Sequence, residues 1–243
     1  MPVQQGFQLF GTQHLLALAL IVAAALLLPL AVRFWLPSAA RPVAYLLAAL
    51  LLGQEGVQLL LEAQRAGLSV ELLPLQLCTM AVYLTAWMLI SRAERVYEVV
   101  YFWGLGGSTQ ALATPDLAQG FPAPAFLLFF LGHGLIIVGV LYGAIVFRLR
   151  PYPASILRVI ALTLAAAAAV FFVDFWLGTN FMYLMEKPDH PSLLDWFGPW
   201  PWYWLGLIGV GVITFLVLYV PFLIADLIRR RRNGNSGGPA TIA

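Results

Sequence analysis

Long runs of apolar residues, separated by short polar or proline-rich stretches, dominate the pattern along the chain. A helix that crosses the hydrocarbon core of a bilayer needs about 20 mostly apolar residues. Seven such stretches occur, at 13–33, 42–63, 72–90, 96–113, 125–148, 155–178 and 202–227. The pattern therefore predicts an all-α, polytopic membrane protein with seven transmembrane helices.

The third stretch contains Cys78, the only cysteine of the chain. Pro74 suits the first turn of a helix, where no backbone donor is lost, which predicts Cys78 about two turns into this span. A single cysteine in a membrane helix is most often a small buried hydrophobe. The alternative is a nucleophile, which requires a base within reach.

Composition supports membrane insertion and excludes some partners. Hydrophobic residues make up 62% of the chain and charged residues 10%, whereas soluble domains carry roughly 25% charged residues. The net charge of +2 provides no broad basic field, so no nucleic-acid partner is expected. The expected partner is membrane lipid, no cofactor or metal is predicted, and the oligomeric state is left open.

The basic residues predict the orientation, because cytoplasmic loops carry an excess of Lys and Arg. A cytoplasmic C-terminus puts every Lys and Arg inside except Arg65 and Lys187. We therefore predict a multi-pass protein of the plasma membrane with its N-terminus outside and its C-terminus inside. Residues 1–228 would form the transmembrane domain, and residues 229–243 a basic, then Gly/Ser-rich cytoplasmic tail, predicted to be disordered.

Polar side chains gather in the outer halves of the predicted spans. At 1.5 Å per residue, Cys78 and His133 each lie about 9–12 Å below the outer boundary. Polar groups within spans usually face the bundle interior or a wet cavity, so six of the seven helices are expected to contribute to a pocket that opens outward or toward the outer leaflet. The contributing residues are His14 of the first span and, in the second to the sixth, Glu55, Gln58, Gln76, Cys78, Ser108, Gln110, His133, Asp174 and Asn180.

Four motifs resemble those of bacterial YwaF-type integral membrane proteins, and the resemblance covers the third to the seventh span. They are Leu73-Pro-Leu-Gln-Leu-Cys78, Gly106-Gly-Ser-Thr-Gln-Ala-Leu-Ala-Thr-Pro-Asp116, Phe129-Phe-Leu-Gly-His133 and Gly178-Thr-Asn-Phe-Met-Tyr-Leu-Met-Glu-Lys-Pro188, the last followed by Ser192-Leu-Leu-Asp195 and Gly198-Pro-Trp-Pro-Trp-Tyr203. One position departs from the family pattern, which has histidine before Leu-Cys where this chain has Gln76.

The eukaryotic relatives of that group include a transmembrane acyltransferase that moves polyunsaturated acyl chains into ether lysophospholipids through an acyl-cysteine intermediate. The resemblance implies that Cys78 is the nucleophile, that His133 is its partner, and that a phospholipid or lysophospholipid is the substrate. Asp174 or Glu55 would then orient the imidazole. The remaining polar residues would bind substrate or stabilise an oxyanion, namely Gln58, Gln76, Ser108, Gln110 and Asn180.

Two other interpretations stay open. The acidic residues and His133 could relay protons or bind a cation, which would make the chain a transporter or receptor for a small solute, without enzymatic activity. Polar side chains also hold membrane helices together, so a structural role is the third interpretation.

Overall fold

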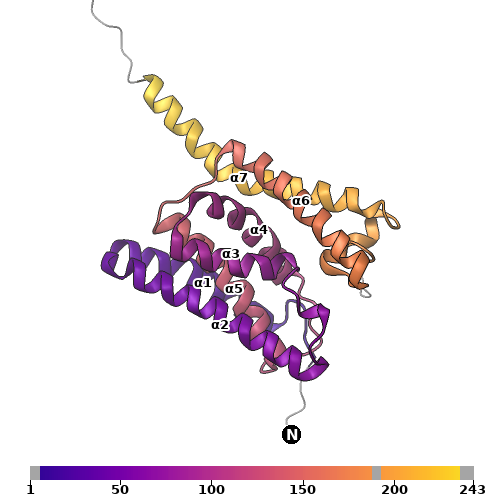
Figure 1. The fold of residues 1–243 in the computed structure, drawn as a ribbon. Coiled ribbons are helices and arrows are strands. Elements are labelled where there is room, and N and C mark those ends of the chain that lie inside the picture. Colours follow the sequence, from indigo (N-terminus) through magenta and orange to yellow (C-terminus); the bar gives the residue numbers. More distant parts are fainter. Residues whose placement is uncertain (1–5, 188–192, 236–243) are drawn as a thin grey trace, which may run out of the picture.

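The computed structural model describes residues 6–187 and 193–235, and these residues form seven α-helices (Figure 1). The helices are α1 (Thr12–Phe34), α2 (Ala40–Ala66), α3 (Leu77–Ser91), α4 (Glu94–Ala113), α5 (Pro124–Ile145), α6 (Pro153–Leu177) and α7 (Tyr203–Asn235). Short 3₁₀ turns lie at Pro37–Ala39, Val70–Leu72, Phe181–Tyr183 and Leu193–Phe197. The prediction of an all-α polytopic membrane protein with seven helices is confirmed.

Five of these helices are long and apolar enough to cross a membrane, namely α1, α2 with the turn before it, α5, α6 and α7. Helix α3 has 15 residues, a length of about 22 Å at 1.5 Å per residue, which is less than the roughly 30 Å of a hydrocarbon core. Helix α4 has 20 residues but begins with a charged first turn. The two short or polar helices therefore depend on their neighbours for placement in the bundle.

The third helix begins later than the sequence predicts. Pro74 precedes α3 instead of occupying its first turn, because Leu73 and Gln76 both have extended backbone conformations. Proline disfavours a helical conformation in the residue before it, and the side chain of Gln76 accepts a hydrogen bond from the distant Met182 N–H at 3.0 Å. As a result, Cys78 lies in the first turn of α3, and the prediction of two turns was wrong.

The last helix continues beyond its predicted end at residue 227. It extends to Asn235, so the arginine run that begins at Arg229 is helical. The remainder of the predicted tail, residues 236–243, lies outside the described residues. Pro188 and Ser192, two positions of the motif between the last two spans, also lie outside them.

Helix α5 is the centre of the bundle and contacts α1, α2, α3 and α4, while α6 and α7 pack against α4 on one side (Figure 1). Four glycines of α5 face these four neighbours. A Cβ atom on any of them would lie 2.6–2.9 Å from a neighbouring side chain, which is too close for any real contact; the pairs are Gly132 with Gln54, Gly134 with Ile21, Gly139 with Thr85 and Gly143 with Tyr97. Small residues allow membrane helices to approach closely, so these glycines set the spacing of the central bundle.

We expect Gly139→Ala to destabilise the protein by about 1–3 kcal/mol, the usual cost of overpacking. The new methyl group would lie 2.6 Å from Cγ2 of Thr85, a fully buried side chain of α3. Thermal unfolding in detergent measures the effect. Gly53→Ala is the matched control, because a Cβ atom there has no neighbour within 4 Å, and alanine is the better helix former. A melting temperature of Gly139→Ala equal to that of Gly53→Ala would contradict the packing.

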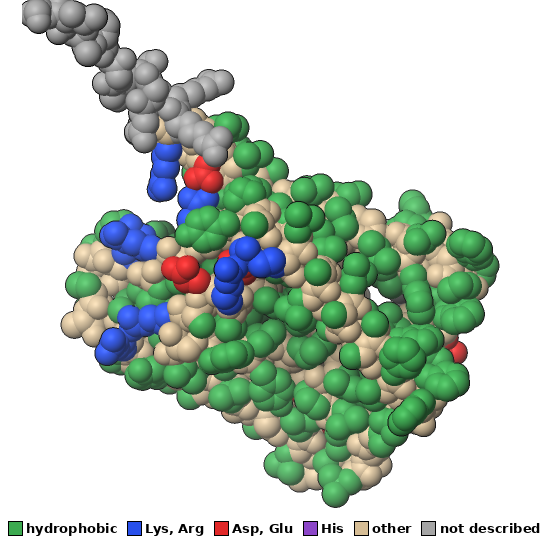
Figure 2. Space-filling view, turned by 45° about the horizontal axis from the view of Figure 1, so that its top comes forward, with side chains coloured by type: hydrophobic (Ala, Val, Ile, Leu, Met, Phe, Trp, Pro, Cys, Tyr) green, Lys and Arg blue, Asp and Glu red, His purple; other side chains and the backbone are tan. Residues whose placement is uncertain are grey.

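Basic residues gather at one end of the bundle, near the point where the C-terminal part of α7 leaves it (Figure 2). Most of the rest of the visible face is hydrophobic. Several of them hold helices together there. Arg158 of α6 donates two hydrogen bonds to the buried Glu98 carboxylate of α4, at 2.8 and 3.0 Å. Arg150 donates two to Asp226 of α7, at 2.9 and 2.6 Å, and these bonds raise the pKa of the Arg150 guanidinium. The placement of this end in the cytoplasm stays a prediction.

Candidate functional site

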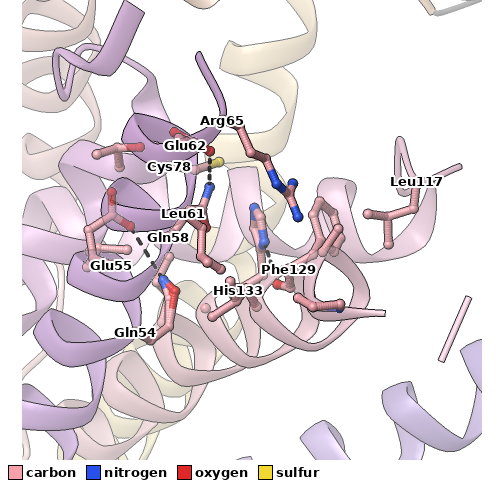
Figure 3. A pocket seen from close by; sticks show the side chains of 17 residues that line it. Gln54, Glu55, Gln58, Leu61, Glu62, Arg65, Cys78, Leu117, Phe129 and His133 are labelled. Atoms are coloured by element: carbon pink, nitrogen blue, oxygen red, sulfur yellow. Dashed lines mark hydrogen bonds between the residues drawn. The ribbon is translucent and has the colours of Figure 1, made fainter. Parts of the chain in front are cut away.

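A cavity of about 260 Å³, lined by polar and apolar side chains, lies between the C-terminal half of α2, the start of α3 and the first half of α5 (Figure 3). This volume is close to the lower end of small-molecule sites, roughly 300–1,000 Å³, which suits a head group or an ester linkage better than a whole lipid. The cavity is lined by Gln54, Glu55, Gln58, Leu61, Glu62, Arg65, Cys78, Thr79, Val82, Leu117, Pro124, Ala125, Leu128, Phe129, Gly132, His133 and Ile136.

Cys78 lines the cavity from the first turn of α3, which begins one residue earlier, at Leu77. Behind it, α4 presents Gly107, where a Cβ atom would lie 3.6 Å from the Cys78 sulfur. The first amide of α3 with a helical acceptor is that of Met80, which donates to the carbonyl of Gln76 at 3.0 Å. The backbone N–H groups of Cys78 and Thr79 are therefore among the unpaired donors that every helix N-terminus carries.

The imidazole of His133 is held by its own helix. Its Nδ1 lies 2.9 Å from the carbonyl oxygen of Phe129, one turn earlier in α5, and the Phe129 ring lies alongside it, with the ring centroids 4.4 Å apart. A carbonyl oxygen only accepts, so Nδ1 carries the proton in the neutral ring and Nε2 keeps its lone pair. The predicted orientation of this ring by Asp174 or Glu55 is wrong, because the backbone carbonyl does so.

Helix α2 lines the cavity with acids and amides on one face, as their spacing of three and four residues predicts. The Gln54 amide donates to the Glu55 carboxylate at 3.4 Å, and the Gln58 amide donates to the Glu62 carboxylate at 3.2 Å. Gln54 and Glu55 are both buried, and the side-chain oxygen of Gln54 has no hydrogen-bond partner. The wall of the cavity therefore contains a buried oxygen without a hydrogen-bond partner among the described residues.

Cys78 and His133 line the same cavity, but no hydrogen bond between described residues joins them. Figure 3 shows Cys78 on the α3 side of the cavity and His133 on the α5 side. Catalytic hydrogen bonds are often long or poorly aligned before substrate binds and tighten in the complex. The arrangement therefore supplies a thiol and an imidazole with an available Nε2 lone pair at the walls of one cavity.

Three predicted site residues stabilise the segment after α6 instead of lining the cavity. Asp174 accepts hydrogen bonds from the Thr179 hydroxyl at 2.7 Å and the Phe181 amide at 2.9 Å. Asn180 accepts from the amides of residues 185 and 186 and donates to a carbonyl. Gln76 is exposed, and its side-chain oxygen accepts a hydrogen bond from the Met182 amide. The position where the family pattern has histidine therefore contacts this segment and not the cavity.

The two predicted residues of α4 also do not line the cavity. Ser108 is buried with its hydroxyl unpartnered, whereas Gln110 is exposed. Only three helices and the loop residue Leu117 form the walls, so the expected contribution from six helices was wrong. The sequence prediction also missed Arg65, which lies beyond the predicted end of the second span at residue 63. The signal for it was the three-residue spacing from Glu62, which continues the polar face of α2.

Fold and site together define the class: a polytopic helical membrane protein with a polar pocket between three of its helices. The chain belongs to the TMEM164 family, whose family model matches residues 9–219. It is similar to an uncharacterized protein of Treponema pallidum (strain Nichols), with 28% identity over 150 residues that cover 62% of each chain. The chain thus matches less than two thirds of the length of that curated relative. No solved structure matches it.

Proposed function

We propose that the chain is a lipid acyltransferase that uses Cys78 as its nucleophile and His133 as its general base. The observation that supports this most is that both side chains line one cavity, with Nε2 of the imidazole left without a hydrogen bond while Nδ1 is held by the Phe129 carbonyl. A cysteine with an adjacent, oriented histidine is the arrangement that activates thiols for acyl transfer. The resemblance to YwaF-type proteins, whose eukaryotic relatives include an acyltransferase with an acyl-cysteine intermediate, favours the same chemistry.

In the first half of the reaction, the Cys78 thiol gives its proton to Nε2 of His133, and the thiolate attacks the ester carbonyl of a phospholipid. The carbon–oxygen ester bond breaks, the departing alkoxide takes the proton from the imidazolium, and a thioester remains on Cys78. In the second half, the hydroxyl of a lysophospholipid gives its proton to His133 and attacks the thioester. The carbon–sulfur bond then breaks, and the thiolate recovers the proton.

The tetrahedral intermediates of both halves carry an oxyanion, which preorganised hydrogen-bond donors stabilise. Ser108, Gln110 and Asn180 lie outside the cavity, so other donors must serve. The unpaired N–H groups at the start of α3 belong to Cys78 itself and to the next residue, Thr79, and we assign this role to them. A helix N-terminus also carries partial positive charge, which favours the negative charge that develops on the oxygen.

Purified protein in liposomes that contain a labelled phospholipid and an unlabelled lysophospholipid tests the proposal. We expect the label to move into the acceptor lipid, and we expect Cys78→Ser to prevent this movement. The transporter interpretation makes the opposite prediction: it expects a solute flux that survives Cys78→Ser and is lost in Glu55→Gln, whose carboxylate is buried in the cavity wall. Flux of that kind without movement of the label would rule out the acyltransferase.

A further inference from the structure

Arg65 is the only Lys or Arg among the described residues that line the cavity, and it forms no ion pair with the carboxylates there. None of the ion pairs or hydrogen bonds of the described residues includes Arg65. Glu62, one turn earlier on α2, binds Gln58 instead. In Figure 3 the guanidinium extends from α2 toward the side of the cavity that His133 occupies. A guanidinium that has no hydrogen-bond or ion-pair partner among the described residues therefore lines the cavity that also contains the candidate base.

The position of this charge is unusual for the chain. Arg65 and Lys187 are the two basic residues that the predicted orientation puts outside, where basic residues are disfavoured. Lys187 lies 3.6 Å from the Asp195 carboxylate, so its charge has a partner. Among residues 6–187 and 193–235, Arg65 has no ion-pair partner, although two carboxylates line the same cavity. A cation on the predicted outer side that has no such partner is available to an external anion.

We propose that Arg65 binds the phosphate group of a glycerolipid and so selects phosphate-bearing substrates. This inference rests on the proposed function and deepens it, because it assigns a recognition residue to the substrate. The planar guanidinium matches phosphate oxygens with two parallel hydrogen bonds. Only the glycerol backbone separates the phosphate of a glycerophospholipid from its ester carbonyl. A phosphate at Arg65 therefore leaves the ester within the same cavity as Cys78 and His133.

The alternative role for Arg65 is to stabilise the C-terminal end of α2. Arg65 lies in the last turn of α2, where a positive charge interacts favourably with the helix dipole. Lysine would serve that role equally well, because only the charge matters. Phosphate binding distinguishes the two side chains, since lysine keeps the charge but loses the paired donors. The ratio of the binding affinities for a phosphate-bearing lipid and for a lipid without phosphate therefore distinguishes phosphate recognition from helix stabilisation.

The experiment measures lipid binding to the full chain with Cys78→Ala, which removes the chemistry, by native mass spectrometry from detergent. The probes are oleoyl lysophosphatidylcholine and monooleoylglycerol. They share an acyl chain, and only the first has a phosphocholine head group. We expect Arg65→Gln to reduce the preference for the phosphate lipid about tenfold or more, the effect of losing a charge-assisted pair, and Arg65→Lys to fall between. Arg41→Gln, at the opposite end of α2, removes the same charge and is expected to leave the preference intact.

An unchanged preference in Arg65→Gln, or an equal loss for both lipids, would overturn the inference. Glycerol 3-phosphate is the competitor that identifies the source of the phosphate. If it binds through Arg65 while the lysolipid does not, the site belongs to a soluble phosphate and the lipid assignment is wrong. The readout is binding to a protein without its thiol, so it can succeed where acyl transfer fails, and the failures of the two proposals are distinguishable.

Discussion

Cys78→Ala is expected to reduce acyl transfer at least 10³-fold, to the background of protein-free liposomes, because removing the nucleophile of a covalent mechanism leaves only positioning effects. The substitution should not disturb the fold. The sulfur forms none of the hydrogen bonds of the described residues, and even a Cβ atom added to the neighbouring Gly107 would lie 3.6 Å from it, an ordinary van der Waals distance. Transfer of a labelled acyl chain between lipids, followed over time, measures the loss.

Cys78→Ser is the companion variant, because it replaces the thiol with a hydroxyl that is similar in size but is a much weaker nucleophile. We expect it to lose transfer as severely as the alanine variant while both melt close to the wild-type temperature. A substantial rate in either variant would remove the covalent route. A loss of transfer that accompanies a fall of many degrees in melting temperature would instead assign Cys78 a packing role.

His133→Ala is expected to lower the transfer rate about 10²–10⁴-fold, the usual contribution of a general base. The imidazole has one nitrogen committed to the Phe129 carbonyl and the other free, which is the arrangement a base requires. His133→Gln is a stricter variant, since its amide can still bond to the backbone but cannot accept a proton at neutral pH. Both variants should retain the protein's melting temperature within a few degrees, because the ring is only half-buried.

His14 provides the matched control for that prediction. It is fully buried, its Nε2 lies 2.8 Å from the Leu112 carbonyl, and its Nδ1 accepts a hydrogen bond from the Phe10 amide at 3.0 Å. Both nitrogens are engaged, so this ring cannot act as a base in the cavity. We expect His14→Asn to lower the melting temperature and to preserve the transfer rate per folded molecule. Equal rate losses in both histidine variants would contradict the assignment of His133.

Helix number and the central segments of the helices follow from composition and apolar run length, because a membrane requires long runs of backbone hydrogen bonds within each segment. The start of α3 did not follow. Pro74 is compatible with a first helical turn, but the contact between Gln76 and Met182 joins residues 106 positions apart. No local pattern records such a contact. The position of Cys78 at a helix N-terminus was therefore outside the reach of sequence reasoning.

The candidate site was predictable where residues share a helix face and unpredictable where they share only a depth. Glu55 and Gln58 reach the cavity together because their spacing puts them on one face of α2. Gln110 and Asp174 lie in the predicted outer halves of their helices too, but Gln110 is exposed, and Asp174 accepts hydrogen bonds from the segment that follows α6. The depth of a residue along its helix limits which other residues it can contact. The rotation of each helix about its own axis then determines which of these contacts form.

Intact-protein mass spectrometry of the purified chain after incubation with phospholipid tests the central claim most directly. The proposal predicts a mass increase that equals one acyl group, located at Cys78, removed by hydroxylamine as a thioester should be, and discharged when lysophospholipid is added. Transfer of acyl chains between lipids without any adduct on Cys78, or with an adduct that persists in Cys78→Ala, would contradict it.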